Sequence, residues 1–354
     1  MAFIQGIELC ERFHFACVEP VLANHFPGLR YASALIGPGS EVLGYDTEMS
    51  TDHDWGPRVV VLLEAEDVHI AGDVRQVLQV HVPNHYDGYP VDVRRTVISS
   101  ISEFVEARLA IPIDKGIELL DWLTFPSQIL AELTGGAVFR DDQGQLAAVR
   151  SRLQFYPHDI WLYLLASTWN RIGQEEHLLL RAGYVGDELG SSIIGSRMVH
   201  DIMSLCFLME RRYAPYAKWF GTAWKQLSCA EELLPLLMNV QSSGTWRARE
   251  DAICQAYAFI ARMHNRLGIT EAMTETVSAF YDRPYNVIHG SVFAQAIARL
   301  ISDPIIRKLA QTRLIGGIDQ ISDNTDFKLM NLWSSGRGAE ERNVLRTLYN
   351  RILA

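Results

Sequence analysis

The sequence has few cysteines, and none lies in a metal-binding or redox spacing. The five cysteines of the 354-residue chain are Cys10, Cys17, Cys206, Cys229 and Cys254. Their number is odd, and no two of them form a Cys-X-X-Cys motif. This scattered set argues against a redox or metal role. It predicts reduced thiols in the core of a cytoplasmic protein.

Long apolar runs and an excess of positive charge are also absent. No run approaches the roughly 20 apolar residues of a transmembrane helix, and the first six residues lack the positive charge of a signal peptide. With 32 basic and 42 acidic residues, the formal charge is −10. This balance disfavours a long nucleic-acid interface, which needs a basic face. We therefore expect a cytoplasmic protein without a membrane or nucleic-acid partner; nothing in the sequence predicts the oligomeric state.

What is present is the pattern of an α+β protein with two domains. Hydrophobic residues make up 48% of the chain, enough for packed cores. Strand-like and helical segments are mixed as far as residue 155, and long helical periods follow from Tyr156. We predict an N-terminal domain over residues 1–155, in which helices flank a small mixed sheet, and an all-α C-terminal domain over residues 156–354.

Individual elements follow from the same periodicities. The predicted strands span residues 31–36, 58–63, 79–82 and 89–96, the last two forming a hairpin. The predicted helices span residues 4–25, 67–78, 102–109 and 126–133, then 158–172, 175–182, 189–213, 218–227, 246–267 and 292–301.

Two motifs stand out between the first two predicted strands. The strand at 31–36 stops at a turn that contains Gly39 and Ser40, and eleven residues separate Ser40 from Asp52. Asp52 and Asp54 lie two apart at the head of the next apolar run. If both lie on a strand, their carboxylates share one face. Either motif alone is typical of an ordinary loop, whereas their order and spacing favour a functional site.

A third acid, Asp92, lies between two valines on a later predicted strand. Three converging carboxylates repel one another unless cations neutralise them, and all-oxygen ligation suits Mg²⁺ or Mn²⁺. Two such ions, about 4 Å apart, would bridge a triphosphate and activate an attacking hydroxyl. The glycine-serine turn would add backbone amides at a helix start that bind phosphate oxygens.

The run from Gly39-Ser40 through Asp52-His53-Asp54 to Asp92 resembles the DNA polymerase beta-type nucleotidyltransferase superfamily, in an uncharacterised bacterial branch. The stretches that carry the resemblance are Gly39 to Pro57, Tyr89 to Arg95 and Arg171 to Trp224. The layout is similar to that of aminoglycoside and lincosamide nucleotidyltransferases, which transfer a nucleoside monophosphate, usually AMP, to a hydroxyl of a small molecule.

The resemblance implies a Mg²⁺-dependent enzyme with ATP or another nucleoside triphosphate as co-substrate and a small-molecule acceptor. In that scheme Asp52 and Asp54 bind both metal ions. Asp92 binds the catalytic ion and helps to activate the acceptor, while Gly39 and Ser40 hold the phosphates.

The helical domain is expected to supply positive charge opposite the metal ions. Arg211 and Lys218 lie on either side of a predicted break between helices. We predict that both face the nucleotide, with Lys218 on the β- and γ-phosphates. Arg197 and Asp201, four residues apart, are expected to pair along one helix.

The general base for the acceptor hydroxyl is not unique in the sequence. Glu176, at the start of a predicted helix, is one candidate, and Glu175 and Asp92 are the others.

Two alternative functions stay open. The chain could transfer the nucleotide to a protein or to an RNA end, and an RNA acceptor predicts steep salt dependence. It could instead be a non-catalytic nucleotide-binding or antitoxin-like protein. The sequence does not identify the acceptor or the nucleotide base.

Overall fold

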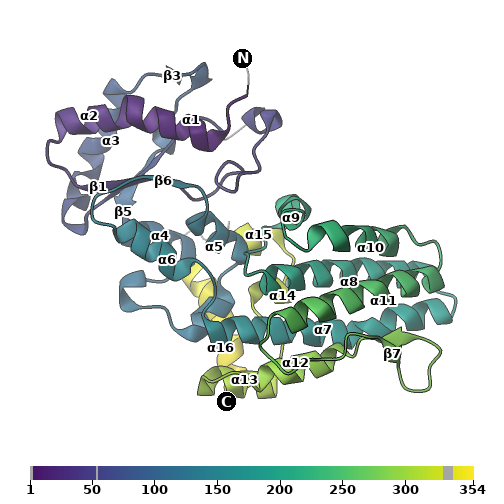
Figure 1. The fold of residues 1–354 in the computed structure, drawn as a ribbon. Coiled ribbons are helices and arrows are strands. Elements are labelled where there is room, and N and C mark those ends of the chain that lie inside the picture. Colours follow the sequence, from purple (N-terminus) through teal and green to yellow (C-terminus); the bar gives the residue numbers. More distant parts are fainter. Residues whose placement is uncertain (1–2, 53–54, 330–337) are drawn as a thin grey trace. The chain divides into compact units, whose positions relative to one another are not determined.

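The computed structural model describes residues 3–52, 55–329 and 338–354. The chain forms two compact units (Figure 1). The sheet unit contains Met1–Ile117, Phe125–Gln154 and Asp326–Arg342, and the helical unit contains Glu118–Thr124, Phe155–Thr325 and Asn343–Ala354. The predicted α+β class is confirmed. A single boundary at residue 155 does not separate the units completely. Glu118–Thr124 precedes this boundary but belongs to the helical unit, whereas Asp326–Arg342 follows it but belongs to the sheet unit.

The sheet unit is built around a four-stranded mixed sheet in the order β5-β2-β1-β6. Its strands are β1 (Tyr31–Leu35), β2 (Val60–Leu63), β5 (Val97–Ser100) and β6 (Ala137–Asp141). β1 runs antiparallel to both β2 and β6, whereas β2 and β5 are parallel. Every residue of β1 and β2 is buried, as expected for central strands covered on both faces.

Helices surround this sheet (Figure 1). They are α1 (Gly6–Phe13), α2 (Glu19–His25), α3 (Ala71–His81), α4 (Ile101–Leu109), α5 (Ser127–Thr134) and α6 (Gln145–Leu153). A π-helical segment, His14–Val18, joins α1 to α2. Pro20, the second residue of α2, has no amide hydrogen for a regular helical bond to the preceding turn, which accounts for the irregularity there. Phe13 and Leu22 pack with Val61 of β2 and Val74 of α3 in one core cluster.

Several predicted strand positions were wrong. Residues 79–81 end α3 instead of forming a strand, and the hairpin consists only of β3 (His85–Tyr86) and β4 (Tyr89–Pro90). The strand that joins the sheet is β5, after the predicted segment 89–96. Short irregular helices fill other connections: η2 (Glu48–Asp52), η3 (Ala65–Ile70), η4 (Val93–Arg95), η5 (Ile113–Lys115) and η6 (Leu119–Thr124).

The helical unit contains the long helices that the sequence pattern predicts. They are α7 (His158–Tyr184), α8 (Glu188–Met209), α9 (Ala217–Trp224), α10 (Ala230–Ser242), α11 (Trp246–Arg266), α12 (Gly290–Ala298), α13 (Pro304–Thr312) and α14 (Ile318–Ile321), with β7 (Ser278–Ala279) and β8 (Asn286–Val287) as a short hairpin. α15 (Thr325–Leu329) and α16 (Gly338–Leu353) contribute residues to both units. α7 continues through residues 173–174, where the pattern predicted two helices.

The centre of the helical unit is the packing of α7 with α8, α11 and α12 (Figure 1). α8 is long and apolar enough, by length and composition, to cross a membrane. Half of its most apolar window is buried within the unit, and a core helix of a globular domain has the same composition.

Candidate functional site

The glycine turn follows the end of β1, where the chain has an unusual backbone conformation. Gly37 and Gly39 have φ values of +94° and +141°, which side chains other than glycine rarely adopt. A Cβ atom on Gly39 would lie 2.5 Å from a carboxylate oxygen of Glu41. Glycine is therefore required at residue 39 by its conformation and by the space available.

The turn presents backbone amides that the fold itself does not use. Within the described part of the chain, no residue accepts a hydrogen bond from the amide of Gly39 or Ser40, while the Ser40 carbonyl accepts one from Tyr45 at 2.9 Å. Residues 41–44 form a turn and no α-helix follows, so the predicted helix start was wrong. Phosphate binding here would rest on the amides alone, without the dipole of a helix.

A buried ion pair holds the turn in place. Glu41 is 2% exposed, and Arg58 donates to its Oε1 from Nε at 3.0 Å and from Nη2 at 2.7 Å. Arg58 Nη2 also donates to the Pro38 carbonyl at 2.5 Å. These three contacts hold the turn against the start of β2. The Arg58 guanidinium is thus engaged in holding the shape of the turn.

A second charged pair lies next to Gly37 of the turn. The Gly37 amide donates to the Glu132 carbonyl at 3.0 Å, and the Arg108 guanidinium lies 3.8 Å from the buried Glu132 carboxylate. A Cβ atom on Gly37 would lie 3.0 Å from Arg108 Nη2. Burial lowers the pKa of Arg108 and raises that of Glu132. Arg108 is therefore a cation beside the turn that sequence reasoning missed, because no local motif connects α4 to residue 37.

Asp52 and Asp92 do not lie on strands. Asp52 is exposed at the end of η2, eight residues before β2 begins, so the predicted shared strand face was wrong. Asp54 lies outside the described residues. Asp92 caps η4 and accepts hydrogen bonds from Arg94 Nε at 2.9 Å and Nη2 at 3.0 Å, which lower its pKa. Among the described residues, no three His, Cys, Asp or Glu side chains form a metal-holding group.

The acidic segment before Asp52 has a structural contact. Asp46 Oδ2 accepts a hydrogen bond from the Gly6 amide at 2.7 Å and from Trp55 Nε1 at 3.1 Å. Because a carboxylate at a helix N-terminus is favourable, Asp46 ties the loop between β1 and β2 to the start of α1.

The helical unit places the predicted basic residues on aromatic rings. Arg211 lies over the ring of Trp161, with its Cζ 4.2 Å from the ring centroid, and Lys218 Nζ lies 5.0 Å from the centroid of Trp219. Both basic side chains belong to exposed residues. Their contact with a nucleotide stays a prediction.

Glu176 has a structural contact that conflicts with the predicted general base. Its carboxylate is 2% exposed and accepts hydrogen bonds from the amides of Ile288, His289 and Gly290, at 2.8, 3.1 and 3.2 Å. These amides lie at the start of α12, so Glu176 holds that helix against α7. Burial raises the pKa of Glu176 to about 7, although the three amides act in the opposite direction. With both oxygens engaged and no solvent access, we assign Glu176 to the support of α12.

The predicted pair of Arg197 and Asp201 was also wrong. Asp201 accepts a hydrogen bond from Arg171 Nε at 2.9 Å, and Arg197 pairs with Glu175. Both ion pairs link α7 to α8. Each charged side chain therefore pairs with the neighbouring helix and not with a residue four positions away on its own helix.

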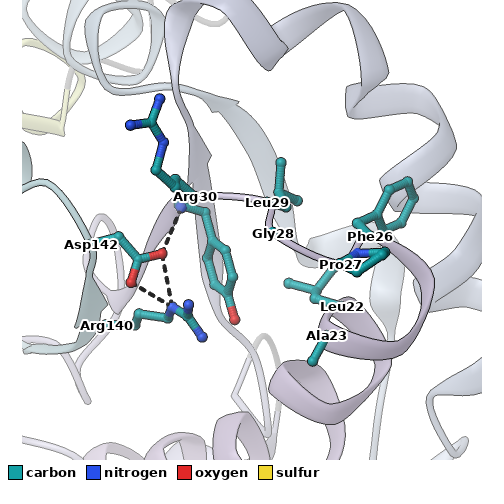
Figure 2. Close-up of a pocket in the computed structure, with 10 residues that line it drawn as sticks. Leu22, Ala23, Phe26, Pro27, Gly28, Leu29, Arg30, Arg140 and Asp142 are labelled. Carbon is teal, nitrogen blue, oxygen red and sulfur yellow. Dashed lines mark hydrogen bonds and ion pairs between the residues drawn. The ribbon is translucent and has the colours of Figure 1, made fainter.

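A cavity of about 520 Å³ lies at the other end of β1, near Tyr31 (Figure 2). Apolar side chains of α2 line it together with Arg140 and Asp142. Arg140 Nε donates to both oxygens of Asp142, at 2.9 and 3.0 Å, and Nη1 donates to Glu19 at 2.9 Å. The charge of Arg140 is balanced by Asp142 and Glu19, so the lining of this cavity does not indicate a charged ligand.

Comparisons with known proteins give three findings. Residues 122–220 match the family described as Domain of unknown function (DUF4037). No curated protein matches the chain. The chain is similar to the crystal structure of a nucleotidyltransferase-like protein from Exiguobacterium sibiricum 255-15, at 12% sequence identity and a TM-score of 0.30, covering 82% of this chain and 87% of that chain. The family match includes all of α7 and α8 but does not reach the glycine turn.

Proposed function

We propose that the chain is a nucleotidyltransferase that transfers a nucleoside monophosphate, AMP from ATP, to a hydroxyl of a small molecule. One observation carries the proposal: the turn after β1 presents two amides without a partner among the described residues, and two buried ion pairs lie next to it. Such a turn suits phosphate oxygens, because glycine lets them approach the backbone and the amides donate to them.

The reaction joins the acceptor oxygen to the α-phosphorus. The bond from that phosphorus to the bridging oxygen breaks, and pyrophosphate leaves with the bonding electrons. The hydroxyl proton passes to a carboxylate. Because Glu176 is engaged by the amides at the start of α12, Asp92 and Glu175 are the remaining candidates for this general base. Gly39 and Ser40 would bind the phosphates through their backbone amides.

The metal requirement belongs to the proposal on sequence grounds. Mg²⁺ or Mn²⁺ would neutralise the triphosphate and polarise the α-phosphate. The described acids do not by themselves fit a three-carboxylate site, since Asp92 is engaged by Arg94. The ion would rest on Asp52 together with Asp54.

The test is label transfer from α-labelled ATP to a panel of small hydroxylated metabolites and antibiotics, with and without Mg²⁺. Asp52→Asn should abolish transfer while the circular dichroism spectrum and melting temperature stay unchanged. Glu48→Gln is the matched control, because Glu48 is another exposed acid of η2. Turnover retained in Asp52→Asn would overturn the proposal.

The same assay separates the alternatives. Label that appears on protein or RNA indicates a macromolecular acceptor. Stabilisation by ATP without any transfer indicates a nucleotide-binding protein.

A further inference from the structure

Two histidine side chains lie against each other at the surface of the sheet unit. His25 is the last residue of α2, and His81 is the last residue of α3. The centroids of their imidazole rings are 4.2 Å apart, and the ring planes are tilted by 34°. Both residues are exposed to solvent. The fold thus places two metal-ligating side chains from distant parts of the sequence at one accessible position.

The local sequence fixes where each histidine stands. In residues 25–27 and 81–83 the histidine is followed by an apolar residue and then by a proline. A residue before a proline disfavours the helical conformation, and Phe26 and Val82 have ψ values of 66° and 134°, so both helices end at the histidine. Phe26 and Val82 both pack in the core cluster of the sheet. They anchor the ends of α2 and α3, which lie side by side (Figure 1).

The two helix ends favour a cation at this position. The last carbonyl groups of a helix have no partner within it, and the C-terminus therefore carries a partial negative charge. Both α2 and α3 present this end beside the imidazole pair. A positive ion held by the two rings would be stabilised by both helices at once.

The ring nitrogens of the pair are available to such an ion. Among the described residues, none forms a hydrogen bond with the imidazole of His25 or of His81. Other histidines are engaged within the fold: His14 bonds to Ser33 at 3.1 Å, and the ring of His264 bonds to Thr270 at 3.0 Å. The exposed pair has no such structural contact to explain its nitrogens.

The chemistry of two imidazoles selects a transition-metal ion. Neutral imidazole suits Zn²⁺, Ni²⁺ and Cu²⁺, whereas Mg²⁺ prefers oxygen ligands. Two nitrogens bound to one tetrahedral Zn²⁺ at about 2.0–2.1 Å lie about 3.3 Å apart. Rings whose centroids are 4.2 Å apart reach this spacing through small rotations of two exposed side chains. The described residues provide no third acid, cysteine or histidine at the pair, so water completes the coordination.

We propose that His25 and His81 bind one divalent transition-metal ion of the Zn²⁺ type, which links the C-terminal ends of α2 and α3. The ligands and the preferred metal differ from those of the Mg²⁺ site in the proposed nucleotidyl transfer, and the inference does not rest on that function. Because the pair forms only when the two helices pack, the ion stabilises the folded sheet unit.

Binding is tested by calorimetric titration of the full chain, first freed of metal with a chelator, using Zn²⁺ as the probe and Mg²⁺ as the comparison. His25→Gln and His81→Gln should each weaken Zn²⁺ binding by at least about tenfold, since changes in the outer shell of a metal site alone cost that much. His85→Gln is the matched control. His85 is exposed on β3, close to His81 in the sequence, and its variant should bind Zn²⁺ like the wild type.

A second measurement identifies the site in the wild type itself. Paramagnetic Ni²⁺ should broaden the imidazole proton resonances of His25 and His81 together in NMR spectra, before that of His85. This result is decisive even where a variant does not fold. Zn²⁺ should also raise the melting temperature of the wild type and of His85→Gln, and should leave that of His25→Gln and His81→Gln unchanged.

The proposal is overturned if the wild type does not bind Zn²⁺ or binds Mg²⁺ equally well in the calorimeter. It is also overturned if a folded His25→Gln or His81→Gln binds Zn²⁺ like the wild type. Equal loss of binding in His85→Gln and His25→Gln, or Ni²⁺ broadening of His85 before the pair, would place the ion elsewhere and reject the assignment.

Discussion

Replacing Arg58 by methionine tests whether the buried ion pair determines the shape of the glycine turn. The substitution leaves the Glu41 carboxylate, which is 2% exposed, without its cation and removes the donor to the Pro38 carbonyl. Breaking a buried pair from one side destabilises a protein by about 3–5 kcal/mol. That is a large part of the roughly 5–15 kcal/mol that stabilises a typical native protein.

The measurement is hydrogen exchange of the β1 and β2 amides, which reports the free energy of opening within the sheet unit. Arg30→Met is the matched control. Arg30 pairs with Glu66 at 3.0 Å, but both side chains are more than half exposed, so its loss should change stability by less than about 1 kcal/mol. Arg58→Met should also lose the thermal stabilisation by ATP that the proposed function predicts.

The double variant Glu41→Gln with Arg58→Met distinguishes two causes of the destabilisation: a buried carboxylate without a cation, and the loss of the packing of the arginine side chain. A neutral amide at residue 41 needs no cation, so the double variant should be more stable than Arg58→Met alone. The reasoning is refuted if Arg58→Met destabilises the β1 amides no more than Arg30→Met does, or if the double variant shows no recovery.

Three further predictions concern conformation and pH. Gly39→Ala should lower both stability and ATP affinity, because its Cβ would lie 2.5 Å from the Glu41 carboxylate at a φ of +141°; unchanged ATP titrations contradict this. Burial lowers the pKa of His14 and of His264 to about 4. The stability that each neutral histidine contributes is therefore complete above pH 6.5 and is lost toward pH 4, by up to about 3 kcal/mol each. In urea denaturation at several pH values, the free energy of unfolding of the glutamine variants should fall less steeply toward acid pH than that of the wild type. The pKa of Glu176 is raised to about 7, so the stability that the protonated Glu176 contributes is complete below pH 4.5 and is lost as the pH rises through 7. The stability of Glu176→Gln relative to the wild type should therefore improve between pH 5 and 8. A difference in stability that stays constant over this range contradicts the shift.

Much of the architecture was predictable from local sequence. The α+β class follows from periodicities that change near residue 155, since strands and helices bury apolar side chains at different spacings. The apolar run at 58–63 predicted a strand, and all four residues of β2 are buried there. The glycine turn was also predictable, because positive φ angles leave a signature in residue type.

The candidate site was less predictable, because its contacts join distant segments. Arg108 reaches Gly37 from α4, and Glu176 reaches the start of α12 across more than a hundred residues. Asp92 looked like a strand residue by alternation, whereas a bond to Arg94 makes it the cap of a short helix. Neither periodicity nor motif spacing records which partner a charged side chain finds.

The sequence by itself therefore determined the α+β class, most of the long helices, the two central strands and the glycine turn, because backbone conformation depends largely on nearby residues and their periodicity. Only the tertiary structure decided what the charged residues do. Glu41, Arg58 and Glu176 could each have been a ligand-binding group by residue type, and burial with specific partners makes them supports for the turn and for α12. Burying a charge is unfavourable without a partner, so the partner's position in space decides the role of the residue.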